Sequence, residues 1–185
     1  MESLNQMINE TLILQQLHDS KLREQAFTAI VREYQEPLYW QIRRIVLYHD
    51  DANDVLQNTF IKAWSAIDAF RGESKLITWL LRIAINEALN FLEKESNKIR
   101  ISEAENNVVS QLQSDPYFDG NELELKFQEV ISKLPKKQQI VFNMKYFQEL
   151  KYEEISQILG TSVGALKTSY HIAVQKIISF FEKLD

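Results

Sequence analysis

The stretch that decides the fold is YEEISQILGTSVGALKTSYH, residues 152–171. Its first half has apolar residues at helical spacing, and Gly160 follows as a residue that readily ends a helix. Thr161 or Ser162 then stands where a side-chain oxygen caps the next helix. The pattern predicts two helices joined by a tight turn. In such a helix-turn-helix the second helix enters the major groove of DNA.

The second helix of this stretch has two distinct sides. Its core side is predicted from apolar or aromatic residues three or four positions apart: Leu166, Tyr170, Ala173 and Ile177. Its outer side is predicted to contact DNA through Ser162, Lys167, Thr168, His171 and Gln175. Lysine and histidine donate to guanine or to phosphate, and a threonine is short enough to reach a base edge or a thymine methyl group.

Composition limits what else the chain does. A chain of 185 residues that is 45% hydrophobic and 25% charged buries one medium core or two small ones, and we expect two small domains. Cysteine is absent, which excludes disulfides and thiolate metal sites. The three histidines, His18, His49 and His171, have no ligand spacing. We therefore expect no metal and no cofactor.

The net charge argues against a protein that binds DNA without a partner. The net charge is −5 and the pI is about 5.3, whereas counterion release favours basic proteins. Residues 122–185 have nine basic and eight acidic side chains and no arginine, so we expect this part to need a partner. No stretch approaches the ~20 apolar residues of a membrane-spanning helix, and no export signal is evident. We expect a cytoplasmic protein that is not inserted in a membrane.

The rest of the chain also has helical periodicity, which predicts an all-α fold. The expected helices are 4–18, 25–48, 52–67, 75–95, 122–134 and 136–147, followed by the helix-turn-helix. Pro37 should kink the second of these or start a new helix. Asp50 or Asp51 is expected to cap the third.

Two domains and a linker follow from this order of helices. Residues 1–98 form a four-helix unit, whose first 20 residues or so are an N-terminal extension of open role. Residues 99–121 are rich in Ser, Asn, Glu, Gln and Asp, which predicts a flexible linker. Residues 122–185 form the helix-turn-helix unit.

The residues resemble a known family at several places. Three stretches are similar to region two of the extracytoplasmic-function (ECF) sigma factors of bacterial RNA polymerase: Asp54–Trp64 (DVLQNTFIKAW), Phe70–Ser74 (FRGES) and Thr78–Asn86 (TWLLRIAIN). Leu134–Gln139 (LPKKQQ) and the helix-turn-helix resemble region four. The resemblance covers roughly residues 22–98 and 122–180. It implies a protein that joins core RNA polymerase and directs it to specific promoters.

The resemblance assigns a polymerase contact to the helix expected at 52–67. Asp54, Gln57 and Asn58 lie at i, i+3 and i+4 and share one polar edge of that helix. In the family this edge docks on the clamp helices of the polymerase's largest subunit. Asn58 departs from the glutamate usual there. The alternative is an ordinary solvated helix face.

Two neighbouring segments carry residues suited to the downstream, −10 promoter element. The loop with Phe70, Arg71 and Ser74 offers an aromatic ring, a cation and a hydroxyl, which suit capture of an unpaired base. The alternative for Phe70 is a loop anchor buried in the core. The next helix carries three polar residues at i, i+4 and i+8, namely Arg82, Asn86 and Asn90. Arginine suits phosphate and asparagine suits base edges.

Region four departs from the family in charge. Gln139, Ser169, Ile172 and Val174 stand where arginine is common. Contacts to the upstream, −35 element should therefore be fewer or more apolar. The alternative is a helix-turn-helix that serves only in packing.

Other functions stay open at this point. A dimeric helix-turn-helix regulator, with an N-terminal domain that dimerises or senses a ligand, predicts tight DNA binding without polymerase. A helical adaptor predicts neither DNA binding nor transcription. No nucleophile elbow, phosphate loop or metal set is evident, so we expect no enzyme and no small-molecule substrate. Family resemblance also implies an anti-sigma factor as a partner.

Overall fold

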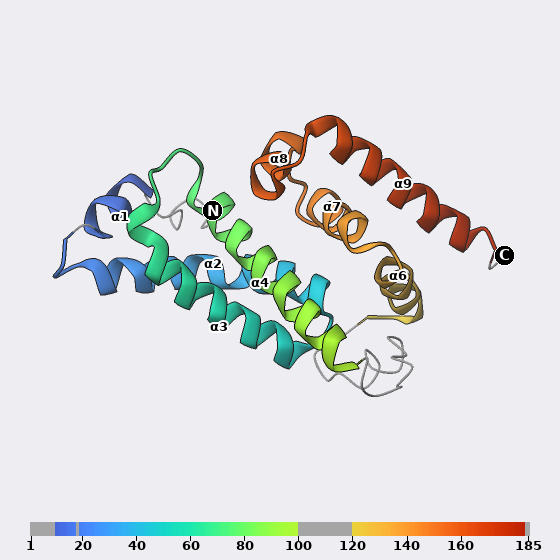
Figure 1. Ribbon diagram of the computed structural model, residues 1–185, viewed down its shortest axis with the longest axis horizontal. Helices are drawn as coiled ribbons and strands as arrows, with labels where there is room; N and C mark the ends of the chain where they lie inside the picture. The colour runs from blue at the N-terminus through green and yellow to red at the C-terminus, as the bar shows by residue number, and fades with distance from the viewer. Residues whose placement is uncertain (1–9, 18, 100–119, 184–185) are drawn as a thin grey trace, which may run out of the picture.

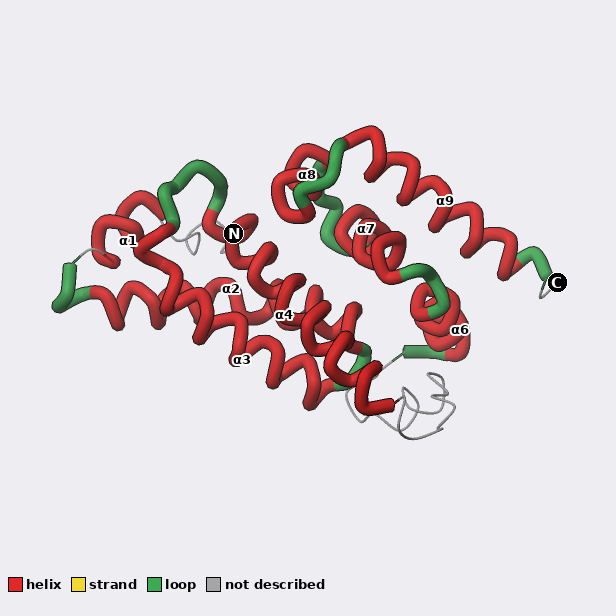
Figure 2. Tube along the Cα trace, in the orientation of Figure 1, coloured by secondary structure: helices red, strands yellow, loops and turns green. Residues whose placement is uncertain are grey.

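The computed structural model describes residues 10–17, 19–99 and 120–183, and the secondary structure of these ranges is helical, without strands (Figure 2). The predicted linker falls almost wholly outside them, as do the first nine residues. The helices are α1 (Glu10–Leu17), α2 (Arg23–Val46), α3 (His49–Ala66), the 3₁₀ turn η1 (Ile67–Ala69), α4 (Leu76–Ile99), α6 (Glu122–Ser132), α7 (Lys136–Tyr146), α8 (Tyr152–Leu159) and α9 (Val163–Phe181). The all-α prediction is confirmed for this part of the chain.

The N-terminal unit is built from α2, α3 and α4, which pack against one another, with α1 on α2 (Figure 1). Helix α2 continues through Pro37, so the proline does not start a new helix. A proline inside a helix costs about 3 kcal/mol. Burial of apolar side chains before and after Pro37 offsets this cost. Ile30, Leu38 and Ile42 are all fully inaccessible to solvent.

Helix α3 begins earlier than the sequence pattern indicates. It starts at His49, and Tyr48 occupies the N-cap position without a side-chain hydrogen bond. The prediction that Asp50 or Asp51 caps this helix is therefore wrong. Both lie inside the first turn, where a negative charge interacts favourably with the positive end of the helix dipole.

The C-terminal unit has a small aromatic core of its own. Val130, Phe142 and Ala173 are buried there, and Phe127 packs edge-on against Phe142 with ring centroids 6.1 Å apart. Tyr170 of α9 stacks on Phe142, which ties the helix-turn-helix to α7. Of the four predicted core positions of α9, Leu166, Ala173 and Ile177 are buried and Tyr170 is partly buried, which confirms the expected orientation of this helix.

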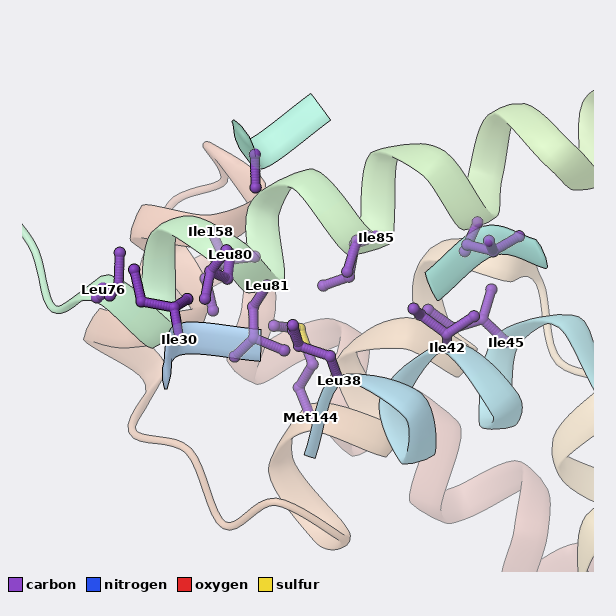
Figure 3. Close-up of a cluster of buried hydrophobic side chains, with 14 of the residues drawn as sticks. Ile30, Leu38, Ile42, Ile45, Leu76, Leu80, Leu81, Ile85, Met144 and Ile158 are labelled. Carbon is purple, nitrogen blue, oxygen red and sulfur yellow. The ribbon is translucent and has the colours of Figure 1, made fainter. Parts of the chain in front are cut away.

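The two units also touch. Helix α7 packs against α2, and α8 packs against α4, while α9 lies on the outer side of α8 (Figure 1). One cluster of buried apolar side chains contains residues from both units. The cluster includes Met144 of α7 and Ile158 of α8 together with Leu38 of α2 and Leu80 of α4, all labelled in Figure 3.

Candidate nucleic-acid and polymerase interfaces

The turn of the helix-turn-helix has the geometry that its residues predict. Gly160 ends α8 with a φ of 62°, a left-handed angle that glycine adopts without steric cost, and its N–H donates to the Ser156 carbonyl at 2.9 Å. Ser162 is the N-cap of α9 and accepts a hydrogen bond from the Ala165 N–H at 3.4 Å. Of the two candidate caps, Thr161 and Ser162, the structure selects Ser162.

The outer face of α9 is open to solvent along its length. Its predicted reading residues are exposed: Ser162, Lys167, Thr168, His171 and Gln175. The Lys167 ammonium lies 5.8 Å from the centroid of the Tyr152 ring, which holds this charge near the start of α9. The Thr168 hydroxyl donates to the Gly164 carbonyl at 3.1 Å, so its methyl group and an oxygen lone pair remain for a ligand.

A cavity of about 510 Å³ lies beside the loop that joins η1 to α4. Its walls include Arg71, Ser74 and Arg82, three of the residues that the sequence assigns to the −10 element. The two arginine cations suit a phosphate, and the serine hydroxyl suits an unpaired base. Tertiary packing has thus brought the loop residues and the first residue of the α4 stripe to one place.

Phe70 is in the same wall but is not free to stack. Its side chain is only 9% exposed, and its ring lies 5.3 Å from the Trp79 ring at an interplanar angle of 43°. This arrangement favours the loop-anchor interpretation of Phe70 over direct stacking on a base.

The polar stripe on α4 is exposed as its spacing predicts. Arg82, Asn86 and Asn90 all lie on the solvent side of the helix. The Asn90 amide is 3.5 Å from the Glu87 carboxylate, which also pairs with Lys62 of α3. The positive charge of Lys62 partly offsets that of Glu87, so this carboxylate repels an approaching phosphate less than an unpaired one would.

The polar edge of α3 is also exposed. Asp54, Gln57 and Asn58 face solvent, while Val55 and Thr59 on the other side of the helix are buried. The structure brings these three side chains together on one surface and leaves them accessible to a partner.

Comparison with known proteins identifies the family. The models of sigma-70 region 2 and sigma-70 region 4 match residues 30–98 and 124–177. The ECF RNA polymerase sigma-E factor of Haemophilus influenzae is 33% identical over 155 residues, which cover 78% of this chain and 82% of that protein. RNA polymerase sigma factor YlaC of Bacillus subtilis is 33% identical over 144 residues, which cover 76% of this chain and 82% of that protein.

The chain belongs to the ECF family of sigma factors. As a sigma factor, it directs RNA polymerase in the initiation of transcription.

Solved structures of sigma factors share the fold. The sigma factor RpoE from Bartonella quintana, crystallised in complex with the anti-sigma factor NepR, matches with a TM-score of 0.69 and 21% identity, over 84% of this chain and 96% of that one. CnrH, in complex with the cytosolic domain of CnrY, matches with a TM-score of 0.68 and 21% identity, over 94% of this chain and 96% of that one. At this identity the likeness concerns the fold alone.

Sequence reasoning missed part of the cavity wall of this sigma factor. Thr78, Trp79 and Glu73 line the cavity, and so does Gln157, which comes from α8 of the other unit. The first three are near the FRGES loop in sequence, so proximity along the chain was an available signal. No such signal pointed to Gln157, because it lies some eighty residues from the FRGES loop in sequence and has the pattern of an ordinary solvated helix position.

The described residues of the sigma factor contain no helix with the length and apolar character needed to cross a bilayer. Their histidine and carboxylate side chains form no group of three or more that suits a metal ion.

Proposed function

We propose that this sigma factor reads two promoter elements with two separate surfaces, one on each unit. The loop and the exposed side of α4 take the −10 element, and the outer face of α9 takes the −35 element. The observation that carries this proposal is the cavity bounded by Arg71, Ser74 and Arg82, because it gathers phosphate-binding and base-binding groups from two segments.

At the downstream element the sigma factor holds an unpaired base. Arg71 and Arg82 attract the backbone, and Ser74 offers a hydroxyl to the base. Phe70 positions the loop by packing on Trp79. Asn86 and Asn90 extend the contact along α4. Binding a flipped base stabilises the melted strand without any chemical step, so the protein acts without enzymatic activity.

At the upstream element Lys167, Thr168 and His171 contact base edges or phosphate, with Ser162 and Gln175 at either end of the surface. Because the unit from residue 122 onward has no arginine, its affinity for DNA is low. Upstream recognition therefore operates only when polymerase holds the unit against the promoter.

Polymerase docks on the edge formed by Asp54, Gln57 and Asn58, which meets the clamp helices of the largest subunit. The protein acts in the cytoplasm, where polymerase and promoter DNA are found. An anti-sigma factor is its proposed regulator. The support is that the sigma factor RpoE, which shares this fold, was crystallised in complex with an anti-sigma factor.

Run-off transcription tests this function. Purified core polymerase from the source bacterium is given a genomic promoter library, with and without the protein. New start sites that share two sequence elements are expected only with the protein. If no new start sites appear, and the protein recovers no core subunits in a pull-down, the proposal fails. Tight binding of the free protein to a symmetric operator would instead favour a dimeric regulator.

A further inference from the structure

Helix α1 lies beside the FRGES loop (Phe70–Ser74), which carries the −10 reading residues (Figure 1). The match to sigma-70 region 2 begins at residue 30, so it includes neither α1 nor Arg23, the first residue of α2. We propose that α1 and Arg23 position the FRGES loop for capture of the unpaired −10 base. This inference rests on the proposed function, because it concerns the same −10 site.

The shape of the FRGES loop depends on a turn at its centre. Arg71, Gly72 and Glu73 are exposed to solvent. Gly72 has a φ of 70°, a left-handed angle that glycine adopts without steric cost. The turn lies between Arg71 and Ser74, so it sets the directions in which these two side chains point. A shift of the turn would move both of them relative to the cavity that they line.

Leu14 of α1 packs on this turn. A methyl group placed on Gly72 would lie 3.9 Å from Leu14 Cδ1, which is an ordinary van der Waals distance. Helix α1 is itself fixed to the body of the unit, because Ile13 and Leu17 are buried in the same apolar cluster as Phe70. An anchored helix beside the turn limits the positions that the loop can take.

Arg23 fixes the segment that comes directly before the loop. Its guanidinium donates two hydrogen bonds to the Asp68 carboxylate, each 3.0 Å long. Asp68 belongs to η1, two residues before Phe70. The Arg23 guanidinium also lies 4.9 Å from the centroid of the Trp64 ring, in the last turn of α3. An exposed ion pair contributes little stability, but two bonds between the same two groups fix their relative orientation.

Positioning of this kind raises the affinity for the −10 strand without adding a contact to DNA. A loop that already has its binding shape loses less conformational freedom when the strand arrives. If the loop has that shape for only a fraction of the time, its apparent affinity falls by that fraction. The outer face of α9 belongs to the other unit, so upstream recognition should not depend on α1.

The variant Leu14→Ala tests the role of α1 in the holoenzyme. Core polymerase with the variant is titrated with a fluorescent single-stranded oligonucleotide that carries the −10 sequence found by run-off transcription. We expect the dissociation constant from fluorescence anisotropy to rise about 3- to 10-fold. Recovery of core subunits and dependence on the upstream element should equal those of the parent. Leu12→Ala is the matched control, because Leu12 is on the same helix but 50% exposed, and it should bind as the parent does.

The outcomes separate a positioning role from a general loss of structure. Leu14 is only partly buried, and urea denaturation checks that the variant still folds. If Leu14→Ala binds the −10 strand as tightly as the parent, the role of α1 is overturned and the proposed function stands. Equal losses of −10 binding, upstream recognition and core binding would also overturn it. Arg71→Ala tests the proposed function separately, because unchanged strand binding by this variant would refute the −10 assignment itself.

A charge exchange at Arg23 and Asp68 separates positioning from simple attraction of DNA. Asp68→Arg adds positive charge, so attraction alone predicts tighter binding of the −10 strand. Loss of the ion pair predicts instead that Arg23→Asp and Asp68→Arg each weaken binding by about 3- to 10-fold. The double variant restores the pair at unchanged net charge and should bind at least about twofold more tightly than either single variant. If Asp68→Arg binds more tightly than the parent, or the double variant no better than the singles, the role of Arg23 is overturned.

Discussion

Gln41 offers a test of how the core of the N-terminal unit is built. It lies on α2 and is fully buried, and neither its Nε2 nor its Oε1 has a hydrogen-bond partner among the described residues. An unpaired polar group in such a site costs about 1–3 kcal/mol. Methionine has nearly the same shape without the amide. Gln41→Met should therefore raise the free energy of unfolding by about 1–3 kcal/mol.

Urea denaturation followed by tryptophan fluorescence measures this change. All three tryptophans, Trp40, Trp64 and Trp79, lie in the N-terminal unit, so the signal reports on the unit that contains Gln41. With a slope of about 2–3 kcal/mol per molar urea, the midpoint should rise by roughly 0.3–1.5 M.

An exposed glutamine on the same helix provides the control. Gln35→Met should change the free energy of unfolding by less than about 0.5 kcal/mol, because Gln35 is solvated in the folded state. If Gln41→Met is no more stable than the parent, the amide of Gln41 is satisfied in solution and the reasoning is refuted.

Three further predictions concern the DNA and polymerase surfaces and the start of α8. Lys167→Ala should weaken use of promoters that depend on the upstream element by about 5- to 100-fold in run-off transcription, whereas Lys183→Ala, an equal loss of charge at the far end of the chain, should not. Gln57→Ala should reduce core polymerase binding at every promoter, measured by pull-down against Gln35→Ala; loss at a single promoter would contradict the assignment. The Lys151 backbone N–H, and then the Lys75 charge, lower the pKa of Glu154 below its usual 4.5, so its stabilising effect is full above that pH and is lost as the pH falls through the lowered value. Glu154→Gln should therefore destabilise the protein at neutral pH in urea denaturation, with a difference that disappears in acid.

The sequence predicted features that depend on neighbours along the chain. Gly160 and Ser162 form the turn of the helix-turn-helix because glycine tolerates a positive φ and serine accepts from a free N–H. The exposed sides of α3, α4 and α9 followed from helical periodicity, since residues three or four apart share a face. A cap was harder to predict for α3, because Asp50 and Asp51 are equally suited to the cap position and to the first turn.

The sequence by itself determined that the chain is helical, that a turn at Gly160 precedes its reading helix and which sides of α3, α4 and α9 meet water, because these depend on local spacing and backbone preference. Only the tertiary structure decided that Gln157 borders the −10 cavity, that Asn143 reaches the Arg44 carbonyl ninety-nine positions away, and that Phe70 is buried. Such contacts depend on how apolar faces of distant helices pack, and packing leaves no periodic signal in the residues that it brings together.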